Sequence, residues 1–151
     1  MSSHEASRIG LQPQGTELFL DHIAHWVPDA DAAAEALRAM GFNLTPFSEQ
    51  HQNDASGKLI PAGAGNRCVM LEQGYLEFLT PLADTPIGAE LEAGISRYTG
   101  VHIGAFACAD TQAGYAHMRE VGIDMRPLAH LERQVQANDG TQATARFTVA
   151  R

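Results

Sequence analysis

An internal repeat is the feature that most constrains the fold of this chain. The pair His22-Ile23 recurs as His102-Ile103, an offset of 80 residues. Three more residues recur in the same order at an offset of 81: Asp29 as Asp110, Gly41 as Gly122 and Pro46 as Pro127. A single inserted residue accounts for the difference between the two offsets. Self-similarity of this kind predicts two structural modules of the same design.

The first module begins with a predicted strand and a predicted helix. Residues 19–27 are rich in apolar and aromatic side chains and stop at Pro28, which is typical of a strand. Asp29 is placed to cap the N-terminus of a helix that ends near Gly41. Residues 42–47 are then predicted to form a strand, followed by a long loop over residues 48–65.

A hairpin completes the first module. Residues 68–71 and 75–79 are apolar segments on either side of Gln73-Gly74, a sequence typical of a tight turn. The predicted order over residues 18–82 is therefore β-α-β-β-β. A connecting helix is expected within residues 83–100, and residues 1–17 are expected to be disordered.

The second module, predicted over residues 101–151, is incomplete. Its third strand is expected at Phe147-Thr148-Val149, and the position 81 residues beyond Glu77 lies past Arg151. We expect either a fragment of a longer protein or a strand supplied by another chain. Because an uncovered sheet edge favours pairing with a second copy, a homodimer is the expected assembly.

Composition excludes several classes of partner. The formal net charge is −8 and the sequence pI is about 5.2, so the chain lacks the basic patch that binds nucleic acid. No apolar stretch approaches the roughly 20 residues of a membrane span, and the N-terminus lacks the pattern of a signal peptide. We therefore expect a cytoplasmic protein without membrane contact, in which Cys68 and Cys108 are reduced, buried thiols.

Strand periodicity sorts the polar side chains of the first module. His22 and Trp26 fall on one face of their strand, and His25 falls on the opposite, helix-packed face. In the hairpin, Tyr75 and Glu77 share a face. A carboxylate among apolar neighbours costs free energy unless it is paired or bound to metal, so Glu77 is a candidate functional residue.

The order of these motifs resembles the vicinal-oxygen-chelate superfamily, and most closely the bacterial glyoxalase-like domain proteins. The resemblance is carried by 20–23 (LDHI), 65–71 (GNRCVML), 74–79 (GYLEFL) and 101–103 (VHI). It implies an α+β fold in which paired βαβββ modules form a half-open β-barrel with a cleft. It also implies a metal site with His22, Glu77 and His102 as ligands, and Glu77 as the catalytic residue. The fourth ligand of the superfamily has no counterpart in this sequence.

The ligand types limit the metal and the reaction. Imidazole and carboxylate groups suit a divalent ion such as zinc, nickel, cobalt, manganese or iron(II). The resemblance implies a lyase or isomerase acting on a small oxygen-chelating metabolite. One alternative is a metal-free protein that sequesters a ligand, as the drug-resistance members do. Another is a ring-cleaving non-haem iron dioxygenase, ranked lower because Glu77 lies in the first module, not the second.

Four further residues are candidates for substrate binding. Asn66 and Arg67 are placed at the cleft end of a strand, where an arginine can bind a carboxylate through two hydrogen bonds. Trp26 and Tyr75 are placed to line the cleft or to fill the barrel.

Overall fold

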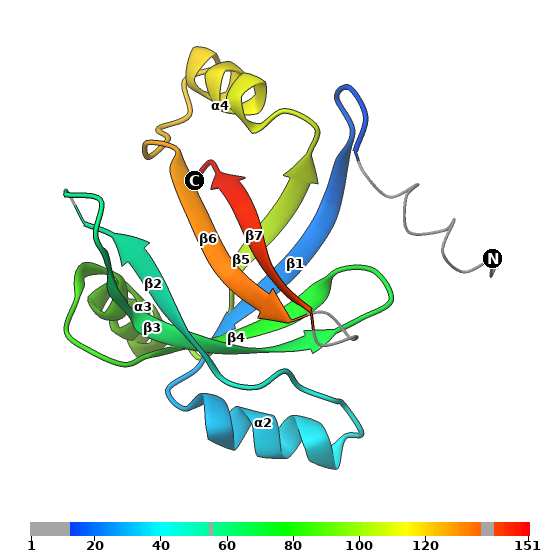
Figure 1. The fold of residues 1–151 in the computed structure, drawn as a ribbon, viewed down its shortest axis with the longest axis vertical. Coiled ribbons are helices and arrows are strands. Elements are labelled where there is room, and N and C mark those ends of the chain that lie inside the picture. Colours follow the sequence, from blue (N-terminus) through cyan, green and yellow to red (C-terminus); the bar gives the residue numbers. More distant parts are fainter. Residues whose placement is uncertain (1–12, 55, 137–140) are drawn as a thin grey trace. The chain divides into compact units, whose positions relative to one another are not determined.

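A computed structural model describes residues 13–54, 56–136 and 141–151 of the 151-residue chain (Figure 1). The predicted disordered segment 1–17 lies mostly outside the described residues. The elements are β1 (Leu18–Trp26), α2 (Ala30–Ala39), β2 (Ser48–Asn53), β3 (Leu59–Met70), β4 (Tyr75–Pro81), α3 (Pro86–Arg97), β5 (Gly100–Cys108), α4 (Thr111–Glu120), β6 (Ala129–Gln136) and β7 (Gln142–Val149). Two compact units result, one over Leu20–Phe106 and one mainly over Ala107–Arg151.

The first unit is built on a curled five-stranded sheet with the order β2-β3-β4-β1-β5. Strand β3 is antiparallel to β2 and to β4, whereas β1 is parallel to β4. Strands β6 and β7 form a separate antiparallel pair in the second unit. The predicted α+β class and half-open barrel type of sheet are confirmed.

Corresponding elements of the sequence repeat share local features in the structure. Asp29 caps α2 by accepting from the backbone N–H groups of Asp31 and Ala32, and Asp110 caps α4 by accepting from that of Ala113. Gly41 and Gly122 follow the two helices with φ angles of 91° and 89°, a left-handed conformation that favours glycine. The strand pair β6 and β7 follows α4 as β2 and β3 follow α2. The described part of the second module therefore has the order β-α-β-β.

Two details of the predicted first module are wrong. Residues 42–47 do not form a strand, although Leu44 makes an isolated bridge to Val69, and the predicted loop over 48–65 contains β2 and the first half of β3. Strand β2 has the polar sequence SEQHQN and lies at the edge of the sheet, so it carries no hydrophobic alternation. Backbone pairing with β3, rather than side-chain burial, forms this strand.

Helices α2 and α3 cover opposite faces of the sheet. Helix α2 packs through Ala30 against Val69 and Phe78, and α3 packs through Leu91 against Ala24 and Leu79. The ring of His25 stacks on that of Phe78, with centroids 4.9 Å apart, which confirms its predicted place on the helix-packed face. In the part of the chain that the structure describes, no helix is long and apolar enough to cross a membrane.

Candidate functional site

The parallel pairing of β1 and β4 brings His22 and Glu77 together. His22 pairs with Tyr75 and Ala24 pairs with Glu77, so these side chains share one face of the sheet. The Nε2 atom of His22 lies 3.7 Å from Oε2 of Glu77. This distance is too long for a hydrogen bond, and the two atoms face each other across the gap. Two of the three predicted metal ligands therefore converge.

Glu77 is buried and held by Asn66. Glu77 is 8% exposed and Asn66 4% exposed, and Asn66 Nδ2 donates a hydrogen bond of 2.5 Å to Oε1 of Glu77. Burial of a carboxylate is costly without a partner, and this charge-assisted hydrogen bond offsets part of the cost. With Oε1 held by Asn66, the second oxygen is the one directed at His22. Asn66 thus lies at the site, in contact with Glu77.

The ring of His22 is fixed on two sides. Its Nδ1 atom lies 2.8 Å from Oδ2 of Asp21, and its ring stacks on Tyr75 with centroids 4.4 Å apart. A histidine whose far nitrogen bonds a carboxylate is the arrangement that usually supports metal ligation by the near nitrogen. Nε2 of His22 and Oε2 of Glu77 are atom types that bind divalent ions, and their use as metal ligands stays a prediction.

The structure does not bring His102 into this group. Its ring lies between those of Trp26 and Tyr98, with centroid distances of 4.3 Å and 4.2 Å, and its Nε2 atom is 3.0 Å from the Tyr98 carbonyl oxygen. Across residues 13–54, 56–136 and 141–151, no set of three or more His, Cys, Asp or Glu side chains is arranged to hold a metal ion. Ligation by His102 stays a prediction.

Trp26 is packed between β5 and α3. Besides stacking on His102, it joins the core formed by Ala24, Leu79 and Leu91. A Cβ atom added at Gly94 of α3 would lie 2.3 Å from the Trp26 ring, so the helix approaches the ring closely. Of the two predicted roles, lining the cleft or filling the barrel, these contacts favour filling.

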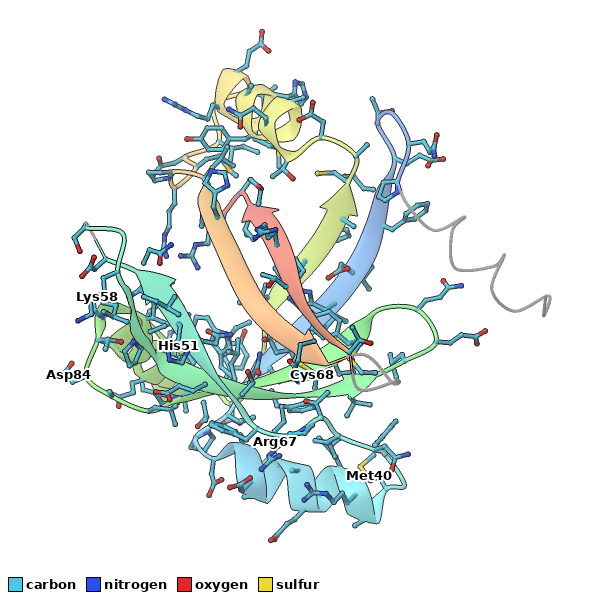
Figure 2. The ribbon with its side chains drawn as sticks, in the orientation of Figure 1. Met40, His51, Lys58, Arg67, Cys68 and Asp84 are labelled. Atoms are coloured by element: carbon cyan, nitrogen blue, oxygen red, sulfur yellow. The ribbon has the colours of Figure 1, made fainter. Side chains whose placement is uncertain are left out.

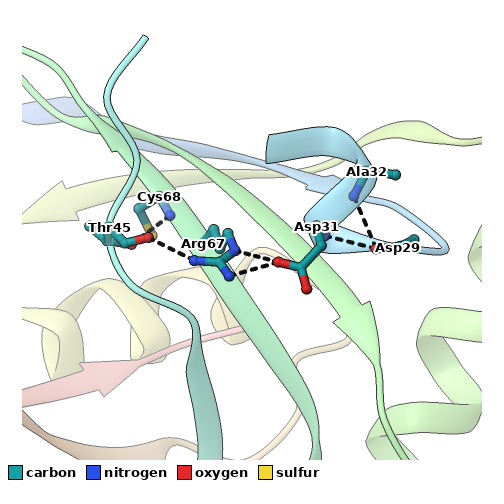
Figure 3. A network of polar contacts seen from close by, with 6 residues as sticks. All are labelled: Asp29, Asp31, Ala32, Thr45, Arg67 and Cys68. Atoms are coloured by element: carbon teal, nitrogen blue, oxygen red, sulfur yellow. Dashed lines mark hydrogen bonds and ion pairs between the residues drawn. The ribbon is translucent and has the colours of Figure 1, made fainter. Parts of the chain in front are cut away.

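The substrate-binding role predicted for Arg67 is not supported, because the side chain points to the other face of β3. Figure 2 shows Arg67 on the side of the sheet that carries α2. Its Nε and Nη2 atoms donate to Oδ1 of Asp31, at 2.9 Å and 2.7 Å, and Nη1 donates to the Thr45 carbonyl oxygen at 3.2 Å (Figure 3). Successive residues of a strand alternate between faces, so Asn66 and Arg67 cannot both reach the cleft. Arg67 ties α2 to the sheet.

Sequence patterns overlooked two residues that touch the candidate ligands. Asp21 precedes His22 in β1, so strand periodicity assigns the two side chains to opposite faces of the sheet. The Asp21 carboxylate nevertheless reaches the His22 ring. Tyr98 caps the C-terminus of α3 and contacts His102 four residues later. The contact of Asp21 could have been inferred from its position next to His22, and that of Tyr98 from its position four residues before His102.

The comparisons with known proteins concern the family and the fold. The family described as "Glyoxalase-like domain" matches residues 20–151. No curated protein matches the chain. Among solved structures, methylmalonyl-CoA epimerase from Streptomyces coelicolor, in a complex with 2-nitronate-propionyl-CoA, has 23% identity and a TM-score of 0.54, with 85% of this chain and 84% of that chain covered.

Two hypothetical proteins share the fold as well. The one from Bacillus halodurans has 19% identity and a TM-score of 0.53, with 87% of this chain and 85% of that chain covered. The one from Staphylococcus aureus has 14% identity and a TM-score of 0.61, with 89% of this chain but 53% of that chain covered. At these identities the likeness concerns the fold alone.

Proposed function

The chain belongs to the glyoxalase-like domain family of the vicinal-oxygen-chelate superfamily, and on that premise we propose that it is a metal-dependent isomerase or lyase acting on a small oxygen-chelating metabolite. The observation that carries the proposal is the convergence of His22 Nε2 and Glu77 Oε2 at 3.7 Å. Nδ1 of His22 is hydrogen-bonded to Asp21, and Oε1 of Glu77 is hydrogen-bonded to Asn66. Both remaining atoms are metal-ligand types, and they face one another.

A divalent ion bound between these atoms would act as a Lewis acid on a substrate carbonyl and lower the barrier to removing an adjacent proton. The protein supplies the groups around it. Glu77 would hold the ion through Oε2, while Asn66 holds Oε1 and so fixes the plane of the carboxylate. Burial of both side chains excludes water and strengthens these interactions.

Tyr75 remains the proposed substrate-contacting residue beside His22. Its ring is parallel to that of His22 within 17° and lies at the start of β4. A flat aromatic surface next to the ligand pair is suited to orient a small carbonyl compound. The candidate carboxylate Glu77 lies on β4 of the first module rather than in the second, which favours isomerase or lyase chemistry over oxygen chemistry.

A second candidate function is metal-free sequestration of a small ligand. The observation that favours it is the position of His102, whose ring is stacked between Trp26 and Tyr98 rather than beside Glu77. A sequestering protein needs an apolar, aromatic-lined surface and no complete ligand set.

Exchange of a carbon-bound proton with solvent distinguishes the two functions. We expect the chain, supplied with Zn²⁺, Ni²⁺, Co²⁺, Mn²⁺ or Fe²⁺ in D2O, to introduce deuterium beside the carbonyl of at least one compound in a panel. The panel holds methylmalonyl-CoA, small 2-oxo acids and small 2-hydroxy ketones, and proton NMR is the measurement. The Glu77→Gln variant is the matched control and should be inactive. Saturable binding of panel members without exchange under any metal would instead favour sequestration.

We also propose a homodimer. The described edge strand β5 exposes Val101 and Phe106, which are 49% and 61% exposed, and large apolar side chains at an edge favour pairing with a second copy. Size-exclusion chromatography with light scattering should give about twice the 16.2 kDa chain mass. A monomer mass at high micromolar concentration would reject the dimer.

A further inference from the structure

The two candidate histidine ligands are held through different ring nitrogens. His22 makes its contact through Nδ1, 2.8 Å from a carboxylate oxygen of Asp21. His102 makes its contact through Nε2, 3.0 Å from the backbone carbonyl oxygen of Tyr98. One partner is a side chain on the same strand, and the other is the backbone carbonyl of Tyr98, the residue that caps the C-terminus of α3.

The chemistry of the partners fixes where each proton lies. An ionised carboxylate and a backbone carbonyl accept hydrogen bonds and cannot donate them, so the ring nitrogen must donate in both contacts. A neutral imidazole has one N–H, and its other nitrogen keeps a lone pair. His22 is therefore protonated at Nδ1, and His102 at Nε2.

We propose that Asp21 and Tyr98 are positioning residues that hold His22 and His102 in opposite tautomers, so that His22 presents the lone pair of Nε2 and His102 that of Nδ1. The use of these lone pairs as metal ligands rests on the proposed function. The two tautomers are expected in the protein without bound metal.

The surroundings of His22 support its assignment independently of Asp21. Stacking on Tyr75 fixes the plane of the ring, and Nε2 then faces Glu77 Oε2 at 3.7 Å. A proton on Nε2 would form a charge-assisted hydrogen bond to the carboxylate, with a distance of about 2.7–2.9 Å. At 3.7 Å the two atoms make no hydrogen bond, and Glu77 takes its hydrogen bond from Asn66 instead.

The surroundings of His102 restrict its ring in a different way. Trp26 and Tyr98 each stack on it with an interplanar angle of 10°. Stacking on both faces fixes the plane of the His102 ring, and within that plane Nε2 lies 3.0 Å from the Tyr98 carbonyl oxygen. A substitution of Tyr98 removes the stacked aromatic ring but leaves the backbone carbonyl oxygen, so it tests the contribution of the ring.

Long-range ¹H–¹⁵N NMR of the full chain reads both tautomers directly. Spectra at a pH of about 8, above the typical histidine pKa of about 6.5, are assigned with His22→Gln and His102→Gln. We expect protonated Nδ1 in His22 and protonated Nε2 in His102. Asp21→Ala should give His22 a mixed tautomer population, whereas the exposed carboxylate variant Asp84→Ala should change neither ring.

Tyr98 has its own pair of variants. Tyr98→Ala should release His102 into a mixed population, and Tyr98→Phe, which keeps the ring, should not. The same tautomer in both histidines would overturn the proposal, as would an unchanged His22 in Asp21→Ala or an unchanged His102 in Tyr98→Ala.

Addition of zinc chloride to the same sample separates this inference from the proposed function. We expect the largest shift at His22 Nε2, the nitrogen that keeps a lone pair beside Glu77, and any shift of His102 at Nδ1 rather than at Nε2. Largest shifts at His22 Nδ1 or His102 Nε2 would overturn the assignment of ligand atoms. Opposite tautomers in a protein that does not respond to zinc or to other divalent ions would support the positioning roles and reject the metal-dependent function.

Discussion

Replacement of Glu77 by glutamine is expected to weaken divalent metal binding by at least about 100-fold, since loss of a group that merely supports a ligand already costs about 10- to 100-fold. Glutamine keeps the shape of the side chain and an oxygen that accepts from Asn66 Nδ2, so the buried hydrogen bond is retained. Its amide nitrogen, however, places a donor where Oε2 faces His22. Calorimetric titration with Zn²⁺ measures the effect.

The Glu72→Gln variant is the matched control, because Glu72 is an exposed residue of the β3–β4 turn and the charge change is the same. It should bind metal like the wild-type chain, and both variants should keep the wild-type thermal unfolding midpoint. Wild-type affinity in Glu77→Gln would remove Glu77 from the metal site. A lower unfolding midpoint in Glu77→Gln alone would mean that Glu77 acts chiefly in stabilising the fold.

Replacement of Gly94 by alanine is expected to lower the free energy of unfolding by about 1–3 kcal/mol, the usual cost of overpacking a core. The direction is opposite to helix propensity, which favours alanine over glycine by about 1 kcal/mol. The added Cβ would lie 2.3 Å from the Trp26 ring and 3.2 Å from Cε1 of His102, so the stacked rings must move. Urea unfolding measures the stability, and the emission of Trp26, the single tryptophan, reports the displaced ring.

Gly114→Ala is the control for this substitution. Gly114 lies within helix α4, and a Cβ there meets nothing within 4 Å. We expect it to leave Trp26 emission unchanged and stability equal or higher by up to about 1 kcal/mol. If Gly94→Ala stabilised the chain as Gly114→Ala does, close packing of α3 on Trp26 would be contradicted.

Sequence alone predicted the parts of the fold that depend on local pattern. Asp29 and Asp110 were recognised as helix caps because a capping side chain acts on the backbone N–H groups that follow it. Alternation assigned His22 and Glu77 to one face of β1 and of β4 separately, and the family resemblance implied that they meet. The parallel pairing of the two strands gives them a common face. Strand β2 was missed because its stability comes from backbone pairing at a sheet edge, which leaves no hydrophobic signal.

The errors at the site have a similar cause. Arg67 was grouped with Asn66, but β3 begins at Leu59, and alternation along it sends the two side chains to opposite faces. Its partner Asp31 lies on a helix far earlier in the chain, a tertiary contact that no local pattern contains. The stack of Trp26, His102 and Tyr98 depends in the same way on the packing of β1, β5 and α3.

Metal content of the purified chain is the most direct test of the central claim, that His22 and Glu77 form a metal site. The untagged protein, exposed to zinc, nickel, cobalt, manganese or iron(II) and desalted, is analysed by inductively coupled plasma mass spectrometry beside His22→Ala and Glu77→Gln. We predict about one ion per chain in the wild type and a large loss in both variants. No retained metal, or equal metal in all three proteins, would contradict the claim.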